Sequence, residues 1–159
     1  MGTQIVVRVR IVIKEKMVLG WRETLSLPEL GIAQINAKVD TGARTSCLHT
    51  FKMEKFEKHN APWVRFWIHP IQRNTEEEII CEAAIIDERV VRDSGGHEES
   101  RYVIESMCSL GGETWPIEIT LTNRENMSFR MLLGRTAMGK RIVVDPNQSY
   151  LIPFEDSSQ

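Results

Sequence analysis

Short segments of alternating apolar and polar residues, separated by glycine and proline, limit most strongly what this chain can fold into. The segment 32–39 (IAQINAKV) alternates in this way, and 62–70 (PWVRFWIHP) is rich in tryptophan and β-branched residues. A period of two is typical of a strand with one buried face. Further segments of this kind are 5–13, 23–31, 77–86, 101–108, 114–122, 129–134, 141–145 and 150–153. Such a series of short strands predicts an all-β fold and favours a closed or partly closed barrel.

Two glycine pairs predict hairpin turns between these strands. Ser94-Gly95-Gly96 lies in the middle of the segment 87–100, and Gly111-Gly112 lies between two further strand segments. Glycine permits the positive φ angles that tight hairpins need. Helix is predicted only for one turn after Gly134, in the sequence RTAMG. The segment 51–59 (FKMEKFEKH) is ambiguous between helix and strand.

The length and composition predict one domain. The chain has 159 residues, of which 42% are hydrophobic and 26% are charged, a balance that allows a single buried core. We expect Trp63 and Trp67 to belong to that core. Residues 1–17 are interpreted as an N-terminal strand extension, 18–153 as the core domain, and 154–159 as a frayed tail.

Net charge and hydropathy argue against two classes of partner. The formal net charge of −2 gives no reason to expect nucleic acid or an anionic membrane surface. No apolar run reaches the roughly 18 residues that a membrane-spanning helix needs. Arg8, Arg10 and Lys14 interrupt the apolar N-terminal segment, which is unlike a secretory signal.

The cysteines favour a reducing compartment. Their number is odd and no CxxC pair occurs, which argues against a disulfide framework or a four-cysteine zinc site. We therefore expect reduced thiols and a cytoplasmic location. The three cysteines are Cys47, Cys81 and Cys108.

Asp40-Thr41-Gly42-Ala43 follows directly on the strand segment 32–39. A turn at this point presents a carboxylate at the end of a strand, where Thr41 can hold the turn through its hydroxyl. Gly42 lets another backbone approach closely. Taken alone, the tripeptide is better explained as an ordinary strand-ending turn, because aspartate and glycine are common turn residues.

Three features occur together in a characteristic order. Asp40-Thr41-Gly42-Ala43 is followed by the glycine-tipped hairpin at 94–96, and then by Leu132-Leu133-Gly134-Arg135 with a short helix. This is the order found in retropepsin-like aspartic peptidases. Residues 18–153, with LGWRE at 19–23 and AKVDTGARTS at 37–46, most resemble a bacterial branch labelled putative ATP-dependent zinc protease and later described as a retropepsin-like acid protease domain. The resemblance implies a barrel of about six or more strands with a flap hairpin and one short helix.

The resemblance also implies an activity, that of an aspartic endopeptidase that works as a homodimer without a cofactor. Two Asp40 carboxylates would meet at the two-fold axis, share a proton and activate a water molecule for attack on a peptide bond. Thr41 would bond across the interface, and Gly42 and Ala43 would complete the active-site turn. Ser94, Gly95 and Gly96 would form a flap over bound peptide, and Leu132, Leu133 and Gly134 would support the turn.

Arg44 departs from the family pattern. Many retropepsins have an aspartate at this place, and it pairs with the arginine that corresponds to Arg135. Two cations would then lie near the cleft, where Asp93 or a glutamate could neutralise them. Alternatively, both arginines would bind substrate carboxylates. Because related proteins are often linked to ligases that add glutamates, the second interpretation predicts a substrate with an acidic tail, such as a polyglutamylated one.

Two other functions compete with this interpretation. A zinc peptidase would need a ligand set, but the chain has neither HExxH nor the phosphate-binding pattern GxxxxGK[ST]. His97 with Glu98 is the first metal candidate and Cys47 with His49 the second, yet two ligands do not make a site. A solvated hairpin and a structural strand explain these pairs more simply. The remaining alternative is an inactive acid-protease fold that binds peptides or proteins.

Overall fold

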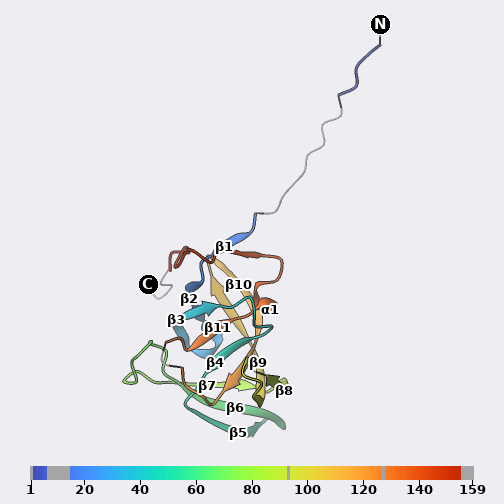
Figure 1. Ribbon diagram of the computed structural model, residues 1–159. Helices are drawn as coiled ribbons and strands as arrows, with labels where there is room; N and C mark the ends of the chain where they lie inside the picture. Colours follow the sequence, from blue (N-terminus) through green and yellow to red (C-terminus); the bar gives the residue numbers. More distant parts are fainter. Residues whose placement is uncertain (1, 7–14, 93, 127, 155–159) are drawn as a thin grey trace.

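The computed structural model describes residues 2–6, 15–92, 94–126 and 128–154, and it shows an all-β fold with one short α-helix (Figure 1). The predicted fold class is therefore confirmed. A 3-10 helix, η1, covers Pro28–Leu30, and the α-helix α1 covers Arg135–Met138, as the sequence predicts. The strands are β1 (Met17–Leu19), β2 (Arg22–Leu27), β3 (Ile32–Val39), β4 (Ser46–His49), β5 (Lys52–Lys58), β6 (Ala61–Ile68), β7 (Ile79–Ala84), β8 (Asp87–Arg92), β9 (Glu98–Leu110), β10 (Glu113–Thr122), β11 (Met131–Leu133) and β12 (Ile142–Val144).

The main sheet closes on itself. Its strands follow the order β10-β4-β11-β3-β2-β9-β8, and β9 also pairs with β10, so that all of these strands except β8 form a ring. β8 is attached to the outside of the ring through β9. A separate sheet, β5-β6-β7, and the parallel pair β1–β12 complete the fold (Figure 1). The closed barrel predicted from the sequence is present.

One hydrophobic core unites the ring and the smaller sheet. Leu48, Ile104 and Ile119 are fully buried on the inner side of the ring. Phe66 and Ile68 of β6 belong to the same cluster. Alternation along each strand sends one set of side chains inward and the other set outward.

The prediction that Trp63 and Trp67 belong to the core is wrong. β6 alternates, and its buried positions are occupied by the other set of side chains. Both tryptophans are half-buried on the opposite face, where the ammonium of Lys58 lies 4.4 Å from the centre of the Trp63 ring and that of Lys52 lies 4.4 Å from the centre of the Trp67 ring. A cation over an aromatic face stabilises such exposed rings.

Most predicted strands occur, with changed boundaries. The segment 32–39 coincides with β3, and the ambiguous segment 51–59 contains β5. The segment 23–31 ends as a strand at Leu27, because Pro28 begins the 3-10 helix η1. Gly31 then reverses the chain with a φ of 72°. The two predicted glycine hairpins are also present, between β8 and β9 and between β9 and β10.

The predicted strand at 150–153 does not form. Leu151 and Ile152 instead donate their backbone N–H groups to the carboxylate of Glu23. The predicted N-terminal strand 5–13 falls largely on residues 7–14, outside the described residues, and residues 5 and 6 have no regular structure. Of the predicted tail, only residue 154 is described. Neither helix of the described chain is long and apolar enough to cross a membrane.

The LGWRE segment at 19–23 forms a buried corner against the C-terminal segment. Glu23 is fully buried, and its carboxylate also accepts a hydrogen bond from the N–H of Gly20 at 2.7 Å. A Cβ atom on Gly20 would lie 2.3 Å from the carbonyl oxygen of Gln148, so only glycine fits there. This corner joins β2 to the segment after β12.

Candidate active site

The Asp40 turn is held by backbone hydrogen bonds on both sides. The N–H of Asp40 donates to the carbonyl oxygen of Leu133 at 2.9 Å, which ties the end of β3 to β11. Within the turn, the N–H of Gly42 donates to Asp40 Oδ1 at 2.9 Å. A Cβ atom on Gly42 would lie 3.1 Å from that oxygen, so glycine keeps the carboxylate uncrowded. Asp40 is half-buried, and its carboxylate is therefore both oriented and accessible.

Gly134 brings the segment after β11 against the segment before β4. A Cβ atom there would lie 2.6 Å from the carbonyl carbon of Thr45, which is closer than side chains pack. The N–H of Gly134 donates to the hydroxyl of buried Ser46 at 3.0 Å. Leu133 is fully buried beside it, whereas Leu132 is half-buried. These predicted supporting residues thus lie directly beside the Asp40 turn.

Arg135 closes the turn from the other side. Its backbone N–H donates to the carbonyl oxygen of Ala43 at 2.8 Å. Its side-chain Nη1 donates to the carbonyl oxygens of Thr41 at 2.9 Å and Gly42 at 3.2 Å. No described carboxylate lies within ion-pair distance of Arg135, so backbone carbonyls take the place of the acidic partner that the sequence suggested.

Arg44 lies in the same turn but is exposed, and none of the described acidic residues forms an ion pair with it. Its charge nevertheless contributes to lowering the pKa of Glu118, after the larger effect of the hydrogen bond from Arg89. Asp93, the other suggested partner, lies outside the described residues. The structure thus separates the two arginines, with Arg135 within the turn and Arg44 facing solvent.

Asp40 continues one side of the ring, opposite to the side that carries Leu48 and Ile119. Lys38 of β3 pairs with Leu132 of β11, which pairs in turn with Cys47 of β4. Asp40 follows two residues after Lys38 and continues the same alternation. Across the sheet the face extends through positions that are paired in register. We call this side of the ring the Asp40 face; four of its members, Cys47, Val103, Thr120 and Thr122, are buried, and the others are Lys38, Asp40, His49, Glu99, Arg101 and Leu132.

The β8–β9 hairpin lies at the edge of the main sheet, because β8 is the last strand in its order. Its tip, Ser94 to Gly96, is exposed, and Gly96 has a φ of 84°. Below the tip, Arg92 Nη2 forms an ion pair with Glu98 Oε1 at 2.6 Å. The predicted hairpin is therefore present, and its role as a flap stays a prediction. His97 and Glu98, which follow the tip, are also exposed, and the described residues contain no group of three or more possible metal ligands.

Cys47 and His49 are embedded in the sheet rather than arranged as a catalytic pair. Cys47 is buried, and burial raises the pKa of its thiol. His49 Nδ1 lies 2.8 Å from the carbonyl oxygen of Arg124, which assigns the proton to Nδ1. Burial lowers the pKa of His49. Burial also raises the pKa of the Cys81 and Cys108 thiols to about 12, so no described thiol is an activated nucleophile.

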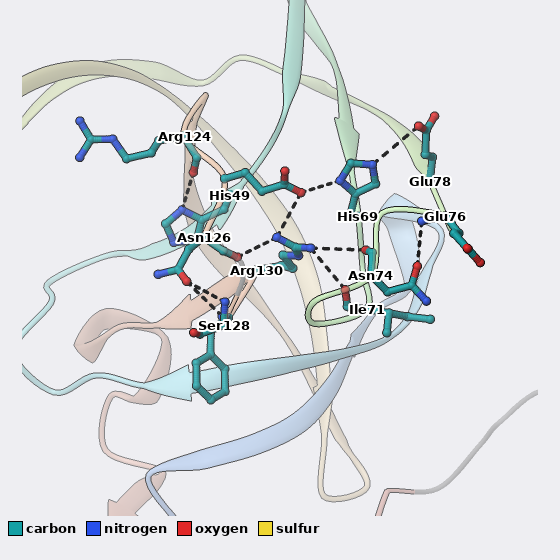
Figure 2. Close-up of polar contacts among 12 residues, drawn as sticks. His49, His69, Ile71, Asn74, Glu76, Glu78, Arg124, Asn126, Ser128 and Arg130 are labelled. Atoms are coloured by element: carbon teal, nitrogen blue, oxygen red, sulfur yellow. Dashed lines mark hydrogen bonds and ion pairs between the residues drawn. The ribbon is translucent and has the colours of Figure 1, made fainter.

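The sequence did not predict a polar cluster that lies close to His49 (Figure 2). Arg130 is completely buried and donates from Nη1 to the carbonyl oxygen of Asn126 at 2.9 Å. Glu125 bridges Arg130 and the buried His69. Arg130 also reaches carbonyl oxygens of the segment after β6, at Ile71 and Asn74. The cluster joins two long loops. In the sequence, the only indication of it is an arginine within the otherwise apolar segment 129–134.

The ring-shaped all-β fold, the Asp-Thr-Gly turn supported by Gly134, and the glycine-tipped hairpin together define a retropepsin-like aspartic peptidase domain. The family model described as "Retropepsin-like aspartic endopeptidase RimB" matches residues 18–155. The chain therefore belongs to the RimB-like family. That description names an aspartic endopeptidase, and it gives no support to the label of ATP-dependent zinc protease.

Curated relatives carry a different name. The chain is 44% identical over 137 residues to a "Probable alpha-L-glutamate ligase" of Shewanella pealeana, covering 86% of this chain and 30% of that protein. A protein of the same name from Parasynechococcus marenigrum is 47% identical over 135 residues, covering 85% of this chain and 29% of that protein. The chain thus spans less than a third of the length of these curated relatives.

A solved structure has the same fold. The protein Lpg0085 of unknown function from Legionella pneumophila superposes with a TM-score of 0.72 at 24% sequence identity. The match covers 87% of this chain and 100% of that chain. At this identity the likeness concerns the fold alone.

Proposed function

We propose that this chain is an aspartic endopeptidase that acts as a homodimer on glutamate-rich protein tails. The observation that carries the proposal is the Asp40 turn. Its carboxylate is accessible, receives the N–H of Gly42, and stands on a turn fixed by β11, Ser46 and Arg135. A rigidly positioned carboxylate is what general acid–base catalysis on a water molecule requires.

One chain supplies one such turn, so the mechanism needs a second copy. Two Asp40 carboxylates in contact would share one proton, because ionising both at short range is unfavourable. One would take a proton from water while the other donates to the peptide carbonyl. Thr41 is exposed, and no described residue binds its hydroxyl, which leaves it available to bond across the interface.

Two exposed valines support a contact between copies. Val18 of β1 and Val143 of β12 pair in register, and each is 46% exposed. Together they form an apolar strip on the parallel strand pair, next to the LGWRE corner. Removing these two side chains from water in a contact between copies would favour association.

Two observations support this substrate class. Proteins named probable alpha-L-glutamate ligases contain a region similar to this chain, which connects the domain with glutamate chemistry. The exposed Arg44 stands in the Asp40 turn without a described acidic partner. An arginine fork is well suited to bind carboxylates. A peptidase that trims glutamate tails would use such a residue.

The decisive experiment compares Asp40→Asn with Asp145→Asn. Both aspartates accept the N–H of the residue two positions on, at 2.9 and 3.0 Å, so the second variant controls for loss of the same turn hydrogen bond. Each variant is assayed for cleavage of a glutamate-rich peptide with and without a chelator. We expect Asp40→Asn to abolish cleavage under both conditions and Asp145→Asn to retain cleavage under both. Activity lost to a chelator and restored by zinc would contradict the proposal.

Mixing wild type with Asp40→Asn tests the dimer. If each active site needs two Asp40 residues, an equimolar mixture after subunit exchange keeps about half of the activity per wild-type chain. Unchanged activity per wild-type chain, or a strict monomer in sedimentation, would contradict the two-chain mechanism. If the wild type binds the peptide but never cleaves it, the chain is a peptide-binding module.

A further inference from the structure

Arg101 occupies an unusual position on the Asp40 face. It lies in β9, between the hairpin tip and the ring, and its side chain is only 17% exposed. Nε donates to Glu99 Oε2 at 3.1 Å, and Nη1 donates to Cys47 Sγ at 3.5 Å. Glu99 is held in turn by the hydroxyl of Thr122 at 3.1 and 3.2 Å. The guanidinium is therefore fixed in direction before any ligand arrives.

The donors of Arg101 are poorly satisfied for so buried an arginine. A thiol is a weak acceptor, and burial raises the pKa of Cys47, which keeps the sulfur neutral. No described residue accepts a hydrogen bond from Nη2. The end of the guanidinium, with Nη1 and Nη2, can therefore receive a better acceptor.

Arg89 provides an internal comparison. It lies directly opposite Arg101 on β8 and carries the same side chain on the same face. Its Nε donates to Asp87 Oδ2 at 2.7 Å and its Nη1 to Glu118 Oε2 at 2.8 Å. Nη2 also reaches Glu118 Oε1 at 3.4 Å. Arg89 is thus satisfied by two carboxylates, whereas Arg101 has one carboxylate and a thiol.

The sheet register gives the separation between Asp40 and Cys47, the residue that Arg101 contacts. Cys47, which Arg101 contacts, is two sheet positions from Lys38, through Leu132. Asp40 lies two residues beyond Lys38. With strands about 4.8 Å apart and about 3.3 Å per residue, the Cα atoms of Cys47 and Asp40 are about 12 Å apart. An extended peptide covers that distance in roughly three residues.

We propose that Arg101 binds the side-chain carboxylate of a substrate glutamate roughly two to three residues from the scissile bond. The carboxylate replaces Cys47 Sγ on Nη1 and takes up Nη2, while Glu99 keeps Nε in place. A bidentate arginine–carboxylate pair is both strong and directional. This inference rests on the proposed function, because it places the ligand relative to the Asp40 turn, but binding itself can be measured without cleavage.

The test uses full-length protein carrying Asp40→Asn, so that peptide binding is measured without turnover. Titration calorimetry compares a short oligoglutamate peptide with the matching oligoglutamine peptide. The variants are Arg101→Gln, Arg101→Lys and, as the matched control, Arg89→Gln. Thermal unfolding of each variant establishes that it is folded. Where cleavage occurs, the same Arg101 and Arg89 changes in the wild-type background are compared by kcat/KM.

We expect Arg101→Gln to weaken oligoglutamate binding by about tenfold or more, the effect of losing one charge-assisted pair, and to leave oligoglutamine binding unchanged. The affinity of Arg101→Lys for oligoglutamate should lie between those of the parent protein and Arg101→Gln, because an ammonium keeps the charge but cannot form the bidentate pair. Should Arg101→Gln fail to fold, the lysine variant carries the comparison. Arg89→Gln should change the affinity for either peptide by no more than about twofold.

Three results would overturn the inference. They are equal weakening of both peptides by the Arg101 variants, equal effects of Arg89→Gln and Arg101→Gln, and absence of oligoglutamate binding by the parent protein. The proposed function can fail separately. A wild type that never cleaves but binds oligoglutamate through Arg101 would refute peptidase activity and leave the carboxylate site established.

Discussion

Replacement of Glu23 should remove a large share of the stability of this fold. Its carboxylate is fully buried and accepts three backbone N–H groups, from Gly20 at 2.7 Å and from Leu151 and Ile152 at 3.0 Å. These bonds attach the segment after β12 to β2. Glu23→Ala leaves all three donors without the partner they now have, and it also leaves a cavity.

The magnitude follows from the burial of each donor. A buried N–H that loses a charged acceptor costs about 2–3 kcal/mol, which applies to Gly20. The N–H groups of Leu151 and Ile152 are partly buried and can turn to water, at about 1 kcal/mol each. The total of about 4–5 kcal/mol compares with an overall stability of about 5–15 kcal/mol for an ordinary domain. Glu23→Gln keeps one oxygen acceptor, so we expect it to cost about half as much.

Urea unfolding at neutral pH, followed by tryptophan fluorescence, measures these losses. Glu29→Ala, which removes an exposed glutamate from η1, serves as the control and should shift the free energy of unfolding by less than about 0.5 kcal/mol. A loss below about 1 kcal/mol for Glu23→Ala would refute the reasoning. It would mean that water replaces the carboxylate as the hydrogen-bond acceptor of these N–H groups in the variant.

Two further substitutions test the active-site turn and its surroundings. Gly134→Ala should cost about 1–3 kcal/mol of stability and lower kcat, because the new Cβ atom would lie 2.6 Å from backbone. The φ of −94° suits any residue, so crowding alone causes the loss. Unchanged activity in a peptide assay would contradict this prediction. His49→Gln should reduce the loss of stability on acidification. Since burial lowers the pKa of folded His49 below the ordinary 6.5, the unfolded chain takes up the proton first, and wild-type stability falls as the pH drops below about 6.5. Urea midpoints measured from pH 7.5 to pH 5 should therefore fall less for the variant, and equal slopes would count against a buried neutral histidine.

Strand positions could be predicted because alternation is a local property. The segment 32–39 coincides with β3 because each of its residues faces either the core or the outside. The pairing of strands is not local. Nothing in the segments reveals that β4 lies between β10 and β11, or that β9 closes the ring onto β10. That order depends on the core as a whole.

The tryptophans show a limit of periodicity. Alternation in β6 assigns Trp63 and Trp67 to one face and Phe66 to the other, but it does not say which face is buried. The size and apolar character of the tryptophans favour the prediction that their face is the buried one. The structure buries Phe66, because lysines on the neighbouring strand β5 cover the tryptophan rings instead.

The candidate site likewise contains some residues that could be recognised from the sequence and others that could not. The Asp40 turn and Gly134 are recognisable because glycines mark places where backbone segments approach closely. Glu23 and Arg101 each have one partner nearby in the chain and others far away, and the sequence does not reveal the distant partners. Arg135 is intermediate, since the sequence indicated a charge near the turn but the structure supplied carbonyl oxygens as its partners.

The turn that presents Asp40 is built almost wholly from hydrogen bonds within one chain, whereas the chemistry proposed for it needs two chains. Folding and dimerisation should therefore be separable. A variant that disrupts the exposed Val18 and Val143 strip, such as Val143→Lys, should keep its unfolding transition at high dilution yet lose activity. Because an association equilibrium depends on concentration, raising the protein concentration should partly restore cleavage by this variant. Loss of the fold together with loss of the dimer would show instead that the Asp40 turn depends on its partner for its shape.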